Sequence, residues 1–496
     1  MILSLAIIPA AAAVLAFLMR SNSLRRALLV LVACLHSLLT AWALLDRPRF
    51  AGVGEWIAFD SAGLLFLTVT SALFLAASVY AVGFLKRESS GMKADIEEGF
   101  LFDNTPEALF TACLLAFLAA MTLVTMSRHF GLLWVAVEAT TLVSAPLIHF
   151  HRHHRSLEAT WKYLLICSVG IAIALLGTYF LSAAGSEAGA GLTFPALASA
   201  AGRLDPAWLK AAFLLLLVGY GTKMGLAPMH TWLPDAHSEA PSAVSALLSG
   251  ALLNCAFLGI VRIHGVMTGA GLGRFSGDTL IAFGLLSMGA AAVFVIGQPD
   301  YKRLLAYSSI ENMGILAVGL GIGGLGEWGA LYHALNHSLV KAALFLTAGN
   351  ILAAYGTKKA AEVRGVVSTL PVSGALWTAG FFAITGAPPF GTFLSELSIL
   401  RAALERGSYW IAAGYLLALT TVFIGMASVV VSMAQGRAAA PGAGTPGESY
   451  RGRTRESAAA VLPPIALLAA SAVLGLVVPR FLDELIRESV RLLGGM

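Results

Sequence analysis

The sequence predicts an all-α protein that crosses a membrane many times, and three observations support this fold class. Of its 496 residues, 58% are hydrophobic and only 12% are charged, about half the charged share that is usual in soluble globular proteins. Apolar runs of about 20 residues, long enough to cross a bilayer core as a helix, recur along nearly the whole chain. The longest polar stretches, 86–105, 184–208 and 436–457, are each too short to bury a core. No soluble domain is therefore predicted.

Taken in order, the apolar runs predict about fourteen membrane-spanning helices. The first run has no basic residues before it, so we interpret it as a retained helix rather than a cleaved signal peptide. A short amphipathic tail, RFLDELIRESVRLLGG, follows the last run. Lys and Arg are concentrated in the odd-numbered connections, which the positive-inside rule places in the cytoplasm, with both termini on the other side. The predicted spans are 1–19, 26–45, 57–85, 107–126, 130–150, 158–183, 209–228, 242–263, 277–297, 303–325, 328–353, 372–403, 410–434 and 458–480.

Two spans contain residues that interrupt a helix. In GYGTKMGLAPMHTWLPDAHSEAPSA (219–243) a glycine and three prolines follow Lys223, and FFAITGAPPFGTFLSELSIL (381–400) contains GAPPFG within an apolar run. Broken membrane helices are tolerated where the freed backbone is buried in protein or lines a wet cavity. Two such breaks, five spans apart, indicate internal repeats with a transport path at the breaks. The predicted divisions are N-terminal helices in 1–106, a first repeat in 107–263, a second repeat in 277–434, a cytoplasmic loop in 435–457, and a last helix with its tail in 458–496.

Ionisable residues fall within the predicted spans, where charge is costly and usually functional. Lys223 comes just before the first break, and Glu396 follows the second. His333, His337 and Lys341 are spaced four apart, so one helical face carries all three. The candidate residues at membrane depth are Glu138, Lys223, Asn254, Glu311, His333, His337, Lys341 and Glu396.

These residue types suit the transfer of protons. Burial disfavours the charged forms of glutamate and lysine, and an opposite partner restores them. Buried lysine changes its protonation readily whereas arginine does not, and histidine titrates near neutrality. Glu138 and Lys223 are therefore expected to change protonation whenever the distance between them changes. The break beside Lys223 supplies backbone groups and room for water.

Structural explanations stay open for single residues. Glu311 could hydrogen-bond a neighbouring helix, and Asn254 could hold two helices together. A histidine pair on one face could ligate haem, but only with a second helix of matching histidines, and the remaining histidines are predicted to lie in connections or near interfaces. HFHRHHR (149–155) could hold zinc, although a basic connection at the cytoplasmic interface explains it better.

The cysteines and the net charge further limit the functions that the sequence can indicate. Cys34, Cys113, Cys167 and Cys255 occur singly in apolar runs, so buried structural cysteines are predicted and an iron–sulfur cluster is not. We predict no haem, flavin or metal in this chain. The net charge of +5 lies in connections, which suggests loop orientation rather than binding of nucleic acid.

The same residues carry a family resemblance. GLAPMHTWLPDAHSEAPSAVSALLSGALLN, DYKRLLAYSSIENMG and HALNHSLVKAALFLTAGNI resemble the signature blocks of antiporter-like subunits. Such subunits occur in respiratory complex I, multi-subunit cation/proton antiporters and group 4 membrane-bound hydrogenases. The motifs are most similar to those of the F subunit of hydrogenase-4-type complexes. The resemblance implies a fourteen-helix core with two inverted five-helix repeats, each with one broken helix. It assigns proton translocation to Glu138, Lys223, His333, His337, Lys341 and Glu396. We expect Glu311 to take part as well, with His230, Asn254 and Lys302 in support.

The chain departs from the family pattern at three points. Asn254 stands where members often have Lys or His, and asparagine cannot titrate, so the central step is expected to use water or Glu311. Glu396 is Glu, as in some branches, where others have Lys. After the last span about sixteen residues remain, about 24 Å of helix, which excludes the long lateral helix of the most distal subunit of complex I.

The resemblance implies a proton-translocating subunit of a complex I-like or hydrogenase-4-like oxidoreductase complex in a bacterial inner membrane. The chain itself would carry out no redox chemistry, and iron–sulfur or nickel–iron centres would lie in partner subunits. The second hypothesis is a subunit of a cation/proton antiporter or ion-coupled uptake module without redox partners. The third is a scaffold whose charges only hold helices together.

Overall fold

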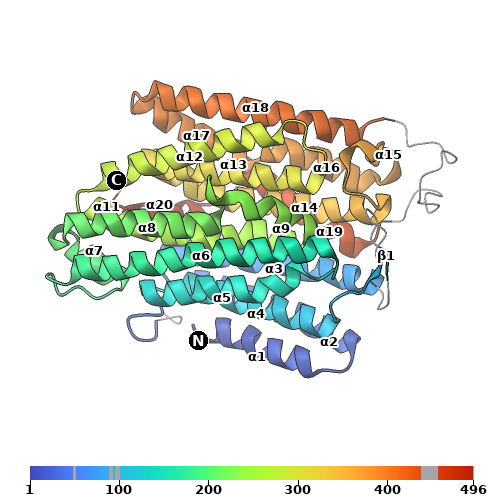
Figure 1. Cartoon of the computed structure of the whole chain (residues 1–496), viewed down its shortest axis with the longest axis horizontal. Coiled ribbons are helices and arrows are strands. Elements are labelled where there is room, and N and C mark those ends of the chain that lie inside the picture. Colours follow the sequence, from blue (N-terminus) through green and yellow to red (C-terminus); the bar gives the residue numbers. More distant parts are fainter. Residues whose placement is uncertain (48–51, 89–92, 95–100, 437–455, 495–496) are drawn as a thin grey trace.

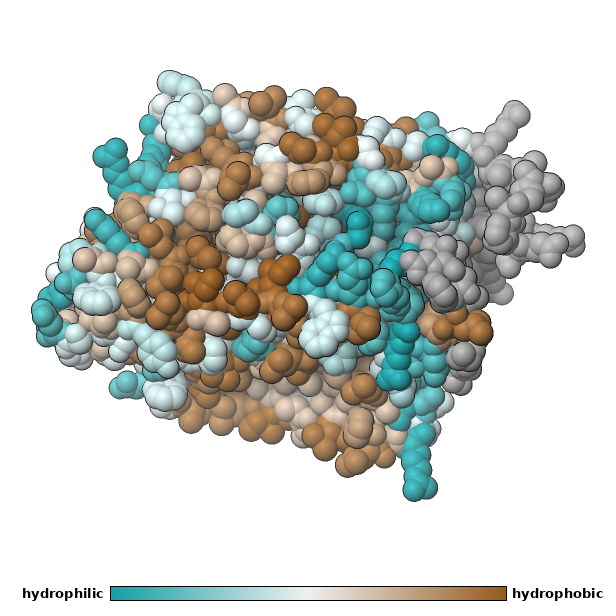
Figure 2. Space-filling model, in the orientation of Figure 1, coloured by the Kyte–Doolittle hydropathy of each residue, from teal (hydrophilic) through white to brown (hydrophobic). Residues whose placement is uncertain are grey.

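The computed structural model of the chain describes residues 1–47, 52–88, 93–94, 101–436 and 456–494. Its helices lie side by side along the long axis of the molecule, and most connections lie at the two ends (Figure 1). Hydrophobic side chains cover much of the middle of the visible face, and hydrophilic side chains gather toward both ends (Figure 2). Such a surface suits a helical bundle that lies in lipid.

The N-terminal part packs three helices together and ends in a small hairpin. Asp60 begins the third helix by accepting the backbone N–H of Gly63 at 2.6 Å, which satisfies one of the free donors at a helix start. The hairpin pairs Lys93 with Phe102, in a stretch predicted only to be polar. The elements are α1 (Ser4–Leu18), α2 (Asn22–Leu45), α3 (Ser61–Arg87), β1 (Lys93–Ala94) and β2 (Leu101–Phe102).

The next part contains the first predicted break. Helix α8 ends at Met224, where Gly225 takes the left-handed conformation with φ of 86°, which glycine adopts without strain. The freed backbone is satisfied by side chains, because the N–H of Ala227 donates to Ser287 Oγ at 2.9 Å. The elements are α4 (Glu107–Met126), α5 (Phe130–Ile148), α6 (His154–Gly185), α7 (Phe194–Ala200), η2 (Ala201–Arg203), α8 (Pro206–Met224), η3 (Met229–Thr231), α9 (Trp232–Glu239), α10 (Ser242–Leu247), the π-turn η4 (Leu248–Leu252) and α11 (Leu253–Gly269).

The following part contains the second predicted break. Helix α16 ends at Ile384 and α17 begins at Gly391, with Gly386 at a φ of 69° between them. The elements are α12 (Gly273–Val295), α13 (Tyr301–Ile322), α14 (Leu325–Tyr355), η5 (Ala360–Glu362), α15 (Val366–Thr369), α16 (Pro371–Ile384), α17 (Gly391–Glu405) and α18 (Tyr409–Ala434).

The last two helices return to the start of the bundle. The predicted amphipathic tail forms α20 (Arg480–Arg491), after α19 (Ala458–Leu476). Trp328 Nε1 donates to Asp483 Oδ1 at 2.9 Å, and Ser61 Oγ donates to Glu488 Oε2 at 2.8 Å. These contacts hold α20 against α14 and α3.

Among the described residues, twelve helical segments are long and apolar enough to cross a membrane. The shorter apolar helices Ser4–Leu18 and Pro371–Ile384 fall below that length, the second because the break at Gly386 cuts it. The chain is thus an all-helical membrane protein, and the count of fourteen spans stays a prediction.

The centre of the bundle is shielded from the surface. The most apolar stretch of the segment Ser242–Gly269 is 100% buried, and that of Tyr301–Ile322 is 94% buried. Polar side chains on α11 and α13 therefore face protein rather than lipid.

Candidate functional site

The predicted site residues lie on several elements in the interior. Nine of the ten side chains are buried, and Glu138 is half-buried. They are Glu138 on α5, Lys223 on α8, His230 on η3, Asn254 on α11, Lys302 and Glu311 on α13, His333, His337 and Lys341 on α14, and Glu396 on α17. The contacts of these residues divide them into groups.

The first group joins Lys223 to Glu138. Lys223 lies in the last turn of α8 and is fully buried. Its Nζ donates to Thr141 Oγ1 at 2.9 Å and to Tyr163 Oη at 2.6 Å. Thr141 Oγ1 in turn donates to Glu138 Oε2 at 3.1 Å. A single hydroxyl therefore connects the two predicted partners.

Further hydroxyls surround this group. Ser168 Oγ on α6 donates to Glu138 Oε1 at 2.9 Å. Ser144 Oγ on α5 lies 2.7 Å from Tyr163 Oη. Because a hydroxyl both donates and accepts, this environment can hold either charge state of the carboxylate and the lysine.

The second group surrounds Lys341 in the middle of α14. The side chain is fully buried, and Nζ donates to Leu305 O at 2.6 Å and to Ser308 Oγ at 2.5 Å. Glu311, one helical turn further along α13, interacts electrostatically with both Lys341 and Glu396. Two carboxyl groups and one lysine side chain thus share this part of the interior.

The two histidines of α14 have different surroundings. His333 Nε2 lies 2.9 Å from Asn312 Oδ1, and its Nδ1 lies 2.8 Å from Ser395 Oγ. His337 stacks on His333 with ring centroids 6.3 Å apart. Both ring nitrogens of His337 are buried and have no hydrogen-bond partner among the described residues. His333 is held in place, whereas His337 is free to exchange hydrogen bonds.

Glu396 lies in the first half of α17, just after the second break. It is 7% exposed, and its Oε1 has no hydrogen-bond partner among the described residues. A β-carbon on Gly386 would overlap Oε2 of Glu396. The absence of a side chain at Gly386 therefore leaves the space that the carboxylate occupies.

Asn254 lies between the two groups. Its Nδ2 donates to Ser338 Oγ on α14 at 2.7 Å and to Gly250 O, in the π-turn η4, at 2.9 Å. The neighbouring Cys255 interacts electrostatically with Lys223, and Ser338 follows His337 in the chain. Asn254 therefore links α11 to α14 beside His337 without titrating itself.

Lys302 is buried at the N-terminal end of α13, away from the middle of the bundle. Its Nζ donates to the carbonyl oxygens of Ser238 at 3.0 Å and Ala240 at 2.6 Å, at the end of α9. His230 lies in the first break, 8% exposed, with its ring 6.3 Å from Phe294.

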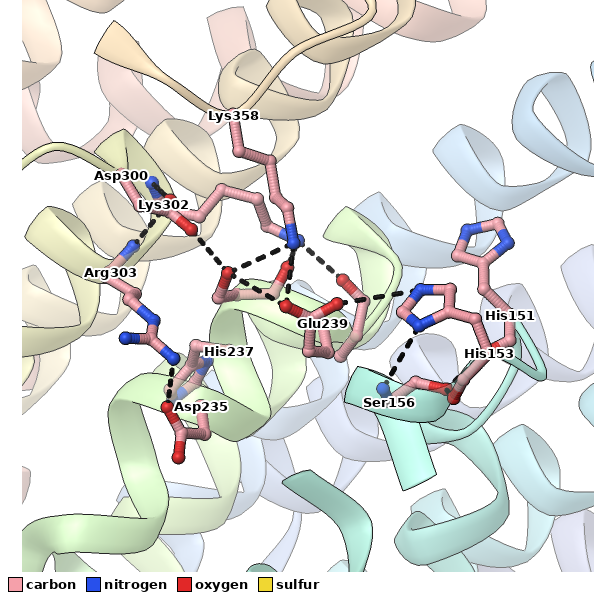
Figure 3. Close-up of polar contacts among 12 residues, drawn as sticks. His151, His153, Ser156, Asp235, His237, Glu239, Asp300, Lys302, Arg303 and Lys358 are labelled. Carbon is pink, nitrogen blue, oxygen red and sulfur yellow. Dashed lines mark hydrogen bonds and ion pairs between the residues drawn. The ribbon is translucent and has the colours of Figure 1, made fainter. Parts of the chain in front are cut away.

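A charged cluster surrounds Lys302 (Figure 3). Glu239 forms an ion pair with Lys358 at 2.7 Å, and its Oε2 lies 3.6 Å from His153 Nε2. Ser238 Oγ donates to Asp300 Oδ2 at 2.5 Å. The cluster joins α6, α9, α13 and the connection after α14 at one end of the bundle.

His237 is a candidate that the sequence analysis missed. It was predicted to lie in a connection or near an interface, and it lies in the short helix α9, fully buried and stacked on Phe345 with ring centroids 5.0 Å apart. Both of its ring nitrogens lack a hydrogen-bond partner among the described residues, and it interacts electrostatically with Lys302 and Lys341. The sequence feature that could have indicated His237 is its position in the same motif as His230.

The prediction that the remaining histidines lie in connections or near interfaces is wrong for His36, which is buried within α2. His264 is buried in the last part of α11, near one end of the bundle. The ring of His36 contacts Thr122 Oγ1 at 3.0 Å and Ser71 Oγ at 2.7 Å. Hydroxyl partners let a histidine lie inside an apolar run.

Histidines of HFHRHHR contact different protein groups. His149 Nδ1 lies 3.0 Å from Ser156 Oγ, and His151 Nδ1 lies 2.9 Å from Asn104 Oδ1. Burial, together with nearby Arg152, lowers the pKa of His149. Within the described ranges, no group of three or more His, Cys, Asp or Glu is placed to hold a metal ion.

The cysteine prediction is correct for two of four residues. Cys167 and Cys255 are buried, whereas Cys113 is half-buried and Cys34 is exposed. The outer face of a membrane helix is apolar too, so an apolar run does not identify the buried side.

Comparison with known proteins gives consistent results. Residues 127–425 match the family described as "NADH:quinone oxidoreductase/Mrp antiporter, TM". The hydrogenase-4 component F homolog of Methylacidiphilum infernorum is 37% identical over 386 residues, which cover 76% of this chain and 79% of that protein.

Two solved structures share the fold. A chain of the membrane-bound sulfane sulfur reductase, an archaeal respiratory membrane complex, matches with a TM-score of 0.84 at 21% identity, over 99% of this chain and 97% of that one. A chain of respiratory complex I from Thermus thermophilus matches with a TM-score of 0.80 at 22% identity, over 100% of both chains.

Proposed function

The chain belongs to the family of NADH:quinone oxidoreductase and Mrp antiporter transmembrane subunits, as its motifs predicted, and we propose that it translocates protons as part of a larger membrane complex. One observation carries the proposal: Thr141 joins Lys223 to Glu138 within the membrane. A lysine and a glutamate that share one hydroxyl can exchange protons through it, because the hydroxyl can accept and donate at once.

The proposed path of the protons, here called the proton line, runs inside the membrane and along its plane. It begins at Glu138 and Lys223, passes Asn254, and continues along His337 and Lys341. Bound water carries the step at Asn254, because an amide does not titrate. Glu311 interacts electrostatically with Lys341, and His333 is held next to the proton line by its hydrogen bonds. Glu396 exchanges protons with one bulk phase. His230 and Lys302 support the line from the first break and the start of α13.

The architecture of the family supports a finer division of the chain. Fourteen helices form the core, with inverted five-helix repeats in 107–263 and 277–434, and each repeat has one of the two broken helices. The N-terminal helices occupy 1–106, and 458–496 contains the last helix and tail. The end of the bundle with the Lys302 cluster faces the cytoplasm, as does the loop 435–457, of which residues 437–455 lie outside the described part of the chain.

The partners are other subunits of a complex I-like or hydrogenase-4-like oxidoreductase complex in a bacterial inner membrane. Iron–sulfur and nickel–iron centres in those subunits release the energy, and this chain moves the protons. The similarity to a hydrogenase-4 component F homolog supports this assignment. The family also contains Mrp antiporter subunits, so the alternative is a cation/proton antiporter without redox partners. Redox subunits in the purified native complex would favour the first function over the alternative.

The function is tested by Glu138→Gln in the purified complex reconstituted into proteoliposomes. The amide keeps the size of the side chain and removes titration, so proton uptake should fall about tenfold or more while assembly persists. Glu405→Gln is the matched control, because Glu405 lies on the surface with its side chain 55% exposed. Normal proton uptake by Glu138→Gln would contradict the proposal and favour the scaffold hypothesis.

A further inference from the structure

A second polar site lies at the opposite end of the bundle from the Lys302 cluster. A pocket of about 280 Å³ opens where α11 and α13 end and where α12 and α14 begin. Gly494 lines it, so it lies close to the C-terminal end of the chain (Figure 1). Lys302 is at the start of α13 and the pocket is at its end, and the helix has 22 residues, a separation of about 33 Å.

Two buried titratable residues line this pocket. His264 and Glu327 are each 3% exposed, and His264 Nε2 lies 3.9 Å from Glu327 Oε1. The other carboxylate oxygen, Oε2, is buried and has no hydrogen-bond partner among the described residues. His264 Nδ1 lies 2.9 Å from Ser276 Oγ, and that hydroxyl also reaches Gly273 O at 3.2 Å. If Ser276 donates to Gly273, it accepts from Nδ1, and Nε2 faces the carboxyl group as an acceptor.

This arrangement suits one shared proton. With His264 protonated on Nδ1 alone, the lone pair of Nε2 can accept a proton from Glu327. At 3.9 Å the two atoms are too far apart for a direct hydrogen bond, so the transfer uses one bridging water or a small movement of the side chains. If that proton moves to Nε2, the pair becomes an imidazolium and a carboxylate with the same total charge. A proton can therefore pass between the two residues without any change in the total charge of the pair.

Charged groups surround the mouth of the pocket. Arg274 on α12 is 91% exposed and Asp278 is 57% exposed, so the mouth meets solvent. Arg406, after α17, donates to the carbonyl oxygens of Gly321 and Ile322 at 3.2 and 3.3 Å and reaches Asp278 at 3.4 Å. On the α20 side, Asp483 accepts from Trp328 and pairs with Arg487 at 2.7 Å.

The pair comes from the same two helices as a contact in the centre of the bundle. Asn254 on α11 donates to Ser338 on α14, and His264 and Glu327 come from the same two helices. They lie ten residues further along α11 and eleven residues back along α14, about 15 Å in each case. Side chains of α11 and α14 therefore approach each other at two depths, in the middle of the bundle and at its end.

We propose that His264 and Glu327 form a proton-exchange site between the central line and the solution on the side opposite the Lys302 cluster. This inference rests on the proposed function and adds the place where protons meet that solution. A proton suits the site better than Na⁺, which needs several oxygen ligands. An imidazole is a poor ligand for Na⁺, and the nearby carbonyls of Gly321 and Ile322 already accept from Arg406.

The first experiment measures proton uptake by the reconstituted complex with Glu327→Gln. We expect a loss of about tenfold or more, with normal assembly. Asp278→Asn, which removes a carboxylate from the rim but not from the pocket, should keep wild-type uptake. Normal uptake by Glu327→Gln beside a defective Glu138→Gln would overturn this inference and leave the proposed function standing. Normal uptake by both variants would overturn both.

The second experiment does not depend on proton pumping. Thr268 lines the pocket, so Thr268→Cys in sealed vesicles should react with a membrane-impermeant thiol reagent added on the side opposite the cytoplasm. The parent chain, with its four native cysteines, gives the background. Labelling above this background only from the cytoplasmic side, or from neither side, would exclude contact between the pocket and the opposite solution, even if Glu327→Gln failed to assemble.

Discussion

Lys223 and Glu138 bind opposite sides of the same hydroxyl. Thr141 Oγ1 accepts from Lys223 Nζ at 2.9 Å and donates to Glu138 Oε2 at 3.1 Å. A direct buried ion pair would hold both groups charged, because removing either partner's charge leaves the other uncompensated. An intervening hydroxyl weakens that coupling and gives the proton a route. This geometry supports the proposal that the two residues act as a switch rather than as a static support.

Thr141→Val should separate the two groups. Valine keeps the shape of threonine but not the hydroxyl. Lys223 therefore loses one acceptor, and a hydrogen bond from a charged donor is worth about 1.5–3 kcal/mol. Proton uptake in proteoliposomes should fall about tenfold or more, with the complex still assembled. Thr141→Ser, which retains the hydroxyl, is the control and should pump at close to the wild-type rate. Equal pumping by the valine and serine variants would show that the hydroxyl has no part in transfer.

Lys223→Arg should assemble and fail to pump. Arginine keeps the positive charge but does not lose its proton in proteins, so a switch that needs a neutral state cannot operate. The control is Lys162→Arg, since Lys162 is 45% exposed and pairs with Glu158 and Asp235 at the surface. The measurement is proton uptake per turnover of the complex. Substantial pumping by Lys223→Arg would mean that the lysine contributes only its fixed charge.

The ionisable part of the site was predictable because such residues are rare in apolar runs. Lys223, Lys341 and Glu396 are conspicuous for that reason, and Gly225 and Gly386 mark the two breaks. Hydroxyl residues are common in membrane helices, and nothing in the sequence separates Thr141 from Thr140, which donates to its own helix at Val137 O. The hydrogen-bond partners of the ionisable residues could therefore be identified only from the structure.

Burial and local helix geometry were less predictable than the existence of the spans. The run that contains Cys34 is apolar on both its protein face and its lipid face, so its composition does not show which side is buried. The π-turn η4 falls in the uniform run SALLSGALL, which predicts only a regular helix. His237 follows Pro234 and Asp235, which favour a connection, yet the packing of α9 buries it.

Arg262→Ala should destabilise the fold far more than a typical surface substitution. Arg262 on α11 pairs with Asp60 at 2.8 Å, with the two side chains 3% and 5% exposed, and also donates to Thr125 O at 3.4 Å. Removing one member of a buried pair costs about 3–5 kcal/mol. Thermal unfolding of the purified complex should show a clear loss, smaller for Arg262→Lys. A midpoint unchanged in Arg262→Ala would contradict the buried pair.

The contact of α20 with Arg47 should depend on pH, but weakly. A hydrogen bond from Arg47, with its charge, lowers the pKa of Glu488, whose side chain is 42% exposed. A carboxyl group with a lowered pKa stabilises the docked helix above its ordinary pKa of about 4.3, and the effect disappears as the pH falls through the lowered value. Because the pair is exposed, we expect at most about 1 kcal/mol.

Hydrogen exchange of α20 measures this effect. Exchange should rise slightly below the ordinary glutamate pKa, and Glu488→Gln should show the same rise at pH 7. A large release of α20 in Glu488→Gln would show that the ion pair matters more than the buried Leu485 and Ile486.

Glu396 can be tested through the glycine that makes room for it. Gly386 and Gly407 have nearly the same φ, 69° and 70°, so alanine at either position carries a similar backbone strain of about 1–2 kcal/mol. A β-carbon at Gly386 would overlap the carboxylate of Glu396, whereas one at Gly407 would meet no atom within 4 Å. Gly386→Ala should therefore displace Glu396 and lower proton uptake, and Gly407→Ala should only lose stability.

Glu396→Gln separates displacement from titration. The amide keeps the size of the side chain, so the complex should assemble, and loss of the titrating group should lower proton uptake about as much as in Gly386→Ala. If Glu396→Gln pumps normally while Gly386→Ala fails, the break is needed for its shape, and protons reach the bulk phase elsewhere. If Glu396→Gln fails only because the complex falls apart, Glu396 is a structural partner of the break. Proton uptake and subunit composition, measured on the same preparations, decide between these outcomes.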